Sequence, residues 1–424
     1  MTPTNKGYTL HYPVSQLRRG GNVLRLKLEH FREERGELVC AEGETLAYAA
    51  PSSTTDIFCA NNRVFCFAES SRQGKFMDTG DSYPAGSGMH NLVALTDSDA
   101  RERYFAIGET TFYYYSETPG SIVTFSPTPS TTALALHHER LFGAVGSRVY
   151  YTKPLDFRGW NSYGEHDAGY FDLLPGAGSV VDIVAMRDKV FFLRRYGITR
   201  LTGYCDIYNF RQEEMPFDMG EIYSRAAVIG EKAYFFTDQG LCCFDGTDSK
   251  HVEGASDEEV VLVTGIRVGV AEHKYVAAEV LTRDGVNAIY LYDPVLKRGR
   301  FVCRNFDACA FGPFIYTLRN GNVYRLLGKA LPTSGKCKVL TEIYFSHLGE
   351  GEKWLEGVHI AGRGTFVVDA VGENGSCSVS AVAGEWTRFP SALRGEKITL
   401  TVGCAQTNVI LQSIDLRVRK EDRV

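Results

Sequence analysis

One pattern of apolar and polar positions recurs along most of this chain. A short apolar strand is followed by a polar turn, a second strand rich in Phe and Tyr, and a turn that carries glycine. Residues 189–193 with 197–201 show the pattern clearly, and so do residues 232–236 with 240–244. The turn glycines are separated by 36 to 51 residues and stand at Gly108, Gly146, Gly197, Gly240, Gly285 and Gly321. This spacing is close to the roughly 40–45 residues of a four-stranded propeller blade.

The repeat predicts an all-β fold whose main part is a β-propeller. Each repeat has an apolar face that it cannot bury alone, and stacking neighbours around an axis buries that face and protects the strand edges. The period indicates about seven blades over residues 52–335, and six or eight blades also fit it. The strand at residues 23–28 is a candidate to close the ring. A long β-sandwich or a solenoid with regular hairpins is the alternative architecture.

The pattern changes after residue 335. A turn-rich stretch at residues 331–336 is followed by six short strand-like segments. Residues 414–419 alternate strictly between apolar and charged, which places one face of that strand against a core. We therefore predict a small C-terminal β-sandwich. The predicted domains are an N-terminal arm with a candidate closing strand (1–51), the β-propeller (52–335) and the β-sandwich (336–424).

Composition supports a β-rich protein and limits its partners. Aromatic residues make up 12% of the chain, and Phe and Tyr favour strands. A net charge of −5 with only short basic runs gives no strong nucleic-acid signal. No stretch approaches the roughly 20 apolar residues of a membrane helix, so no membrane partner is expected. The polar N-terminus and the absence of any CxxC pair among 11 Cys favour a reduced, cytoplasmic location where the chain is made.

Few residues suggest chemistry. His137, His138 and Glu139 form the most ligand-like cluster. Adjacent residues on a strand point to opposite faces, so the two histidines are not expected to share a metal. The aspartates in residues 97–99 and 245–248 offer too few oxygen donors for a calcium loop. Nucleophile-elbow, zinc-protease, P-loop and dinucleotide motifs are also missing, so we predict no catalytic residues, no metal and no cofactor.

The connector at residues 156–174 is the longest insertion within the predicted blades. Loops held on a rigid scaffold are where binding residues gather. The weak binding candidates in this connector are Trp160, Tyr163, His166, Asp167 and Tyr170. The favoured alternative is a loop pinned by its aromatic residues, which packs across the next blade and buries Trp160.

Several segments resemble the propeller-containing neck, nozzle or DNA-stabilisation proteins of tailed bacteriophages and prophages. The resemblance is diffuse and runs over most of the chain. It rests on residues 16–20, 28–31, 36–39, 148–160, 187–203, 224–246, 358–362 and 385–389. It implies a structural role in a particle, and virion association after assembly.

These observations together predict a non-catalytic structural or assembly protein of a phage-like particle, such as a tail, neck or hub component. It would act through contacts with other structural proteins or with copies of itself. One alternative is a carbohydrate-binding or carbohydrate-hydrolysing propeller, with aromatic residues and pKa-shifted carboxylates at the propeller mouth. The second alternative is a bacterial protein-interaction scaffold, which would expose an apolar or aromatic patch on one propeller face.

Overall fold

The computed structural model forms two compact units. Residues 46–298 and 304–325 form the first, here called the blade unit; residues 1–45, 299–303 and 326–424 form the second, the terminal unit. Among the described residues, no helix has the length and apolar character needed to cross a membrane. The residues that the structure describes are 5–14, 23–29, 31–34, 37–40, 43–96, 102–109, 111–118, 121–125, 129–157, 159–160, 168–203, 209–252, 260–263, 265–328, 337–404 and 409–421.

The blade unit is built from antiparallel sheets that follow one another along the chain. Five of them contain four consecutive strands each. The first two are β6 (Asp56–Ala60), β7 (Arg63–Ala68), β8 (Gln73–Phe76) and β9 (Ser82–Pro84), then β10 (Asn91–Thr96), β11 (Glu102–Ile107), β12 (Phe112–Thr118) and β13 (Ser121–Phe125). The third is β14 (Ala133–His137), β15 (Arg140–Val145), β16 (Arg148–Tyr151) and β17 (Gly169–Asp172). The fourth and fifth are β18 (Val180–Met186), β19 (Lys189–Arg194), β20 (Gly197–Thr202) and β21 (Arg211–Met215), then β22 (Ala227–Ile229), β23 (Lys232–Thr237), β24 (Gly240–Phe244) and β25 (Ser249–His251).

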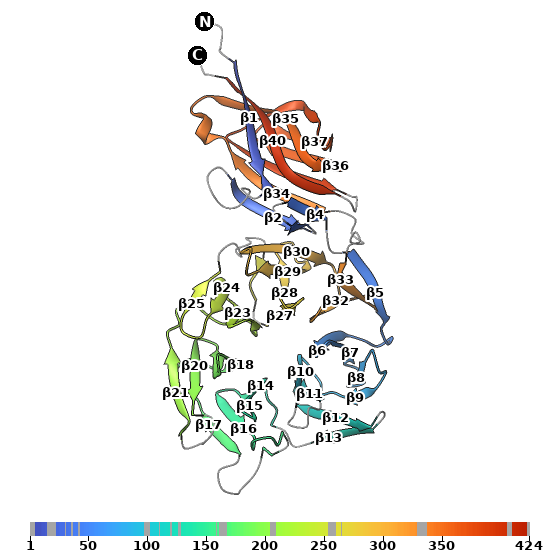
Figure 1. Ribbon diagram of the computed structural model, residues 1–424, viewed down its shortest axis with the longest axis vertical. Coiled ribbons are helices and arrows are strands. Elements are labelled where there is room, and N and C mark those ends of the chain that lie inside the picture. The colour runs from blue at the N-terminus through green and yellow to red at the C-terminus, as the bar shows by residue number, and fades with distance from the viewer. Residues whose placement is uncertain are drawn as a thin grey trace. The chain divides into compact units, whose positions relative to one another are not determined.

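Two further groups of strands continue the series. β28 (Tyr275–Thr282) pairs with β29 (Asn287–Asp293), with β27 (Val268–Ala271) and with the short β26 (Val260–Val261). The last group is β31 (Ala308–Phe311), β32 (Ile315–Arg319) and β33 (Asn322–Gly328), completed by β5 (Gly43–Ala49). Figure 1 shows these sheets arranged in a ring, with β6, β10, β18 and β27 on its inner side. Several four-stranded antiparallel sheets in this arrangement are consistent with a β-propeller of about seven blades.

Burial between neighbouring sheets explains why these sequences form blades. Buried clusters join the first sheet to the second, the second to the third, the third to the fourth, the fourth to the fifth, and the last back to the first. Phe76 of β8, for example, lies 4.7 Å from Tyr104 of β11, measured between ring centroids. Burying a side chain of this size contributes about 1.5–3 kcal/mol. The fully buried aromatic residues of the second strands are Phe65, Phe67, Phe105, Phe142, Phe191, Phe192 and Phe235.

The recurring glycines have two different structural reasons. Four of the six have the positive φ that a hairpin turn requires, namely Gly146, Gly240, Gly285 and Gly321. Gly108 and Gly197 do not, and close packing explains them instead. A Cβ on Gly108 would lie 2.8 Å from the backbone oxygen of Ser87, and one on Gly197 would lie 2.9 Å from the Cβ of Ala177. The spacing was therefore informative, although turn geometry accounts for only part of it.

The strand that completes the last sheet is β5. Ala50, just after it, donates its backbone N–H to the oxygen of Gly321 at 3.0 Å, and Ala47 and Tyr48 pack against the buried cluster of the first and last sheets. The sequence proposed residues 23–28 for this position, and that assignment was wrong. β2 (Val23–Glu29) pairs instead with β34 (Cys337–Tyr344) of the terminal unit.

The terminal unit contains two sheets whose strands come from both ends of the chain. The first has β1 (Asn5–Pro13), β3 (Phe31–Glu34), β4 (Glu37–Cys40), β35 (Glu352–Arg363), β38 (Trp386–Arg394) and β40 (Ile410–Glu421). The second has β2, β34, β36 (Thr365–Gly372), β37 (Gly375–Val382) and β39 (Lys397–Cys404), with β30 (Arg298–Arg304) beside β2. A short 3-10 helix spans Ser346–Leu348. The sequence treated residues 1–51 as a separate arm, whereas β1 pairs with β40 along its whole length.

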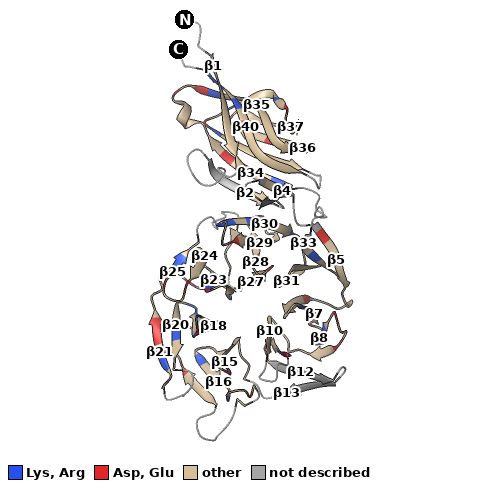
Figure 2. Ribbon diagram, in the orientation of Figure 1, with Lys and Arg blue, Asp and Glu red and all other residues tan. Residues whose placement is uncertain are grey.

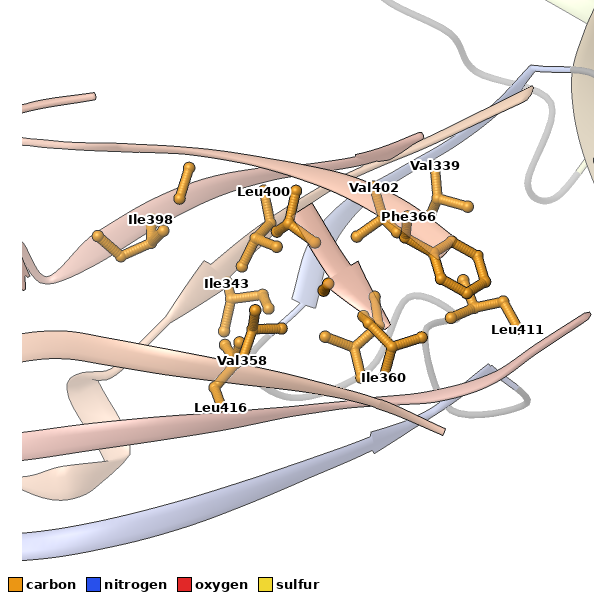
Figure 3. Packing of buried hydrophobic residues seen from close by; sticks show 14 of the residues in the cluster. Val339, Ile343, Val358, Ile360, Phe366, Ile398, Leu400, Val402, Leu411 and Leu416 are labelled. Atoms are coloured by element: carbon orange, nitrogen blue, oxygen red, sulfur yellow. The ribbon is translucent and has the colours of Figure 1, made fainter. Parts of the chain in front are cut away.

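One buried cluster lies between the strands of these two sheets. Its members include Val358, Ile360 and Leu416 from the first sheet, and Ile343 and Leu400 from the second. Figure 3 shows these side chains pointing toward one another. The alternation at residues 414–418 follows from this packing, because Ile414, Leu416 and Val418 of β40 enter the cluster.

Closure by β5 and β33 generates a stability prediction. Val323 of β33 is fully buried in the cluster that joins the first and last sheets. Val323→Asp places an unpaired charge there, so we expect the free energy of unfolding to fall by about 3–5 kcal/mol. Val295→Asp is the matched control, because Val295 is 87% exposed and should change stability by less than about 0.5 kcal/mol. Equal urea midpoints for the two variants would contradict this account of closure.

Candidate functional site

Charged side chains gather where the inner strands of different blades begin. The residues of this inner cluster are Asp56, His90, Asp182, Arg225, Arg267 and Glu279. They come from the first, second, fourth, fifth and sixth groups of strands. Elsewhere charged positions of both signs are scattered over the strands (Figure 2). The inner cluster thus brings titratable side chains from five groups of strands together.

Arg267 connects three groups of strands. Its guanidinium forms a bidentate pair with Asp56 of β6, at 3.0 Å from Nη1 to Oδ1 and 2.7 Å from Nη2 to Oδ2. Nη1 also donates to the backbone oxygens of Ile57 and of Cys309 in β31. Glu279 lies 3.7 Å from Nε. Paired charge-assisted hydrogen bonds of this kind are strong and fix orientation.

Arg225 and Asp182 make a second connection. Arg225 precedes β22 and donates through Nη2 to the backbone oxygen of Thr132, just before β14, at 2.6 Å. Asp182 of β18 accepts the backbone N–H of Ala226 at 2.9 Å. Burial raises the pKa of the Asp182 carboxyl and lowers that of the Arg225 guanidinium. The third, fourth and fifth sheets are therefore held together by polar contacts.

The remaining members have pKa values shifted by the same environment. Burial, together with Arg225 and Arg267, lowers the pKa of His90, so its ring is neutral near pH 7. Burial raises the pKa of Glu279, whose Oε2 accepts a hydrogen bond from the Cys309 thiol at 3.5 Å. The Cys309 thiol has a strongly raised pKa and stays protonated, so it is a poor nucleophile. The cluster is a compensated set of charges in which two carboxyls, Asp182 and Glu279, resist ionisation.

The connector candidates have different surroundings. Trp160 is 2% exposed and packs with Phe105, Leu141 and Phe157. Its indole Nε1 has no hydrogen-bond partner among the described residues. Tyr170 lies on β17 and is exposed. The other three candidates, Tyr163, His166 and Asp167, lie outside the described residues.

Exposed apolar side chains collect near the turns of the third and fourth sheets. This turn patch consists of Val145, Tyr170, Leu174 and Tyr196, which are between 38% and 57% exposed. Backbone hydrogen bonds tie residues 173 and 180 to the turn at residues 146–147, and residue 196 to residue 177. The segments that carry the patch therefore lie side by side.

Arginines border the turn patch. The Cζ of Arg148 lies 4.3 Å from the ring centroid of Tyr170, and its Nε lies 2.7 Å from Asp172. Arg195 lies beside the ring of Tyr196 and pairs with Glu221. Apolar and aromatic groups with a polar rim are the composition of many protein-binding surfaces.

The two histidines of the ligand-like cluster face the same way, which corrects the sequence argument. His137 ends β14, but His138 has a φ of 42° and belongs to the turn. Strand alternation therefore does not separate them, and their ring centroids lie 4.2 Å apart. Asp188, from the neighbouring β18–β19 turn, approaches His138 with 2.8 Å between Oδ1 and Nε2.

Sequence reasoning missed the inner cluster. Asp182, Asp238 and Asp293 each lie in a strand or directly after one. All three do accept backbone N–H groups, but only Asp182 belongs to the cluster. A usable signal was present. Arg225 stands two residues before β22 and Arg267 one residue before β27, where an apolar strand pattern begins.

Comparison with known proteins gives this chain no family and no function. No protein-family model and no curated protein matches the chain. The solved structure of U3-55K is 12% identical with a TM-score of 0.44, covering 67% of this chain and 98% of that one. The RRP9 WD40 repeats are 11% identical with a TM-score of 0.42, covering 68% and 97%. The extracellular domain of the putative hybrid two-component system BT4673 from B. thetaiotaomicron is 10% identical with a TM-score of 0.45, covering 84% and 54%.

These similarities concern WD40 and other propeller proteins of varied origin. Nothing in them indicates a phage structural protein. The phage resemblance seen in the sequence therefore stays a prediction, and the propeller rests on the arrangement of the sheets.

Arg267 provides a test of the inner cluster. Removing one partner of a buried ion pair costs about 3–5 kcal/mol. The side chains of Arg267 and Asp56 retain exposures of 26% and 23%. We therefore expect Arg267→Met to lower the free energy of unfolding by a smaller amount, about 2–3 kcal/mol. Adding Asp56→Asn should recover part of this loss, and a double-mutant cycle from urea denaturation measures it. Simple additivity of the two changes would show that the pair does not couple.

Trp160 tests the packing of the connector. We expect Trp160→Ala to lower the free energy of unfolding by about 3–5 kcal/mol, because it leaves a cavity among buried aromatic residues. Trp160→Phe should cost less, since the Nε1 has no partner to lose. Tyr170→Ala, at an exposed position, should cost less than about 0.5 kcal/mol. Thermal or urea unfolding of the three variants gives the comparison, and an unchanged Trp160→Ala midpoint would exclude the packing role.

Proposed function

We propose that the chain is a non-catalytic structural or assembly protein that acts through protein–protein contacts. The observation that carries the proposal is the turn patch, an apolar and aromatic surface bordered by Arg148 and Arg195. Tyr and Arg are enriched at the centres of protein interfaces. We take the partner to be a second copy of this chain, because an oligomer is what a particle component needs.

The terminal unit fits this role if it is a β-sandwich. Support comes from its two antiparallel sheets and from the buried cluster that draws side chains from both of them. We propose the sandwich on that ground. A narrower role in a phage-like particle, as a tail, neck or hub component, remains a prediction from the sequence.

The inner cluster favours one alternative function. Raised pKa values at Asp182 and Glu279 are a property that carboxyls share in acid–base sites. A carbohydrate-hydrolysing propeller would need such a pair. Both carboxyls, however, face arginines inside the same cluster, and this structural pairing explains their environment without a substrate.

The self-association proposal is tested by size-exclusion chromatography with light scattering. We expect the full chain at high concentration to form oligomers, and Leu174→Glu or Tyr196→Glu to shift them to monomers. The introduced carboxylate would have to be desolvated in the contact, which opposes binding.

Val295→Asp is the control, because it adds the same charge at an exposed position away from the turn patch. It should leave the oligomer intact. A wild-type chain that stays strictly monomeric would reject self-assembly through this surface. Hydrolysis of a glycan that is lost in Glu279→Gln would instead favour the carbohydrate alternative.

A further inference from the structure

Two hairpin turns from neighbouring blades bring three metal-ligating side chains together. The β14–β15 turn carries His138 and Glu139, with φ of 42° and 66°, and the β18–β19 turn carries Arg187 and Asp188, with φ of 50° and 56°. Both are two-residue turns with positive φ at each position, the geometry of type I′ hairpins. Both turns therefore present their side chains with the same backbone geometry.

The three side chains meet at one point. One ligand atom each from His137, His138 and Asp188 lies within 4.8 Å of the other two. The closest pair, His138 Nε2 and Asp188 Oδ1, is 2.8 Å apart. Zinc binds imidazole nitrogen at about 2.0–2.1 Å and carboxylate oxygen at about 2.0–2.2 Å, which places neighbouring ligand atoms some 3–4 Å apart. A small side-chain adjustment would bring all three atoms to that spacing.

We propose that His137, His138 and Asp188 bind a divalent transition-metal ion, with Zn²⁺ as the best match, and that the ion cross-links the third and fourth sheets. Two imidazoles and one carboxylate suit zinc and its neighbours, whereas calcium and magnesium prefer sites made only of oxygen. Asp188 is 80% exposed, so an ion can enter from solvent and keep water as a further ligand.

The chemistry of the ligand set supports the proposal. Metal ions bind unprotonated imidazole nitrogen and carboxylate oxygen, and the two turns bring two imidazoles and one carboxylate to the same point. The carboxylate of Asp188 contributes the negative charge that a dication requires. If the three residues formed only a hydrogen-bonded cluster, they would not bind Zn²⁺.

The experiment uses the full chain after treatment with a chelator and dialysis. We expect isothermal titration with Zn²⁺ to show one site that depends on these residues, and the thermal midpoint to rise when Zn²⁺ is added. His138→Asn and Asp188→Asn keep residue types that tolerate positive φ, so the turns should persist. Each variant should weaken binding at least tenfold and abolish the rise in midpoint, because losing a ligand costs no less than the roughly tenfold lost with an outer-shell partner.

His273→Asn is the matched control. His273 also has a positive φ in a turn, the three-residue turn between β27 and β28, and it is exposed. This variant should bind Zn²⁺ as the wild type does. Binding that is absent in the wild type, or equal in all four proteins, would overturn the proposal. Titration with Co²⁺ gives a second readout, and a thiolate charge-transfer band would place the ion on cysteine and likewise overturn it.

Discussion

The fold of the blade unit depends on covering both faces of every sheet. The second strands make this requirement visible. Phe191 and Phe192 are adjacent on β19 and fully buried, yet Phe192 packs with the third sheet and Phe191 with the fifth. The sequence of a strand that is buried on both faces is a continuous apolar run. Segments such as residues 190–193 therefore do not alternate between apolar and polar residues. No single sheet can satisfy the requirement, and a series in which the last sheet covers the first leaves no face without a neighbour.

The inner cluster answers a second constraint, that buried charge must be compensated. Its contacts differ from those of the apolar clusters in their reach. Apolar packing joins consecutive sheets, whereas Arg225 reaches from the fifth sheet to Thr132 before the third, passing Asp182 of the fourth. Arg267 likewise contacts β6 and β31. Directional bonds of this kind specify how the inner strands are oriented, which apolar contact alone does not.

Much of the fold could be predicted from the sequence, because the strands and turns depend on local patterns. The spacing of Gly108 to Gly321 predicted the all-β repeat, and the alternation near residue 414 predicted a strand with one buried face. Long-range pairing was not readable. Nothing local distinguishes residues 23–28 from residues 43–49 as the partner of β33, since both are short apolar strands. This limit affected the prediction of the histidine cluster most. Strand alternation wrongly separated His137 from His138 because a turn begins between them, and Asp188 reaches them only through the stacking of two blades.

The closing sheet has a consequence for the order of events in folding. Its strands β31, β32 and β33 come from the end of the blade unit, while β5 comes from its beginning. During synthesis β5 stays without its partner β33 until residue 321 and its neighbours have left the ribosome. Contacts this distant in sequence are slow to form, because the loop entropy is lost before the contact is gained. Within the blade unit the ring therefore closes last, and until then β5 and β33 are unpaired edges on which a misfolded chain or a neighbouring copy could add a strand.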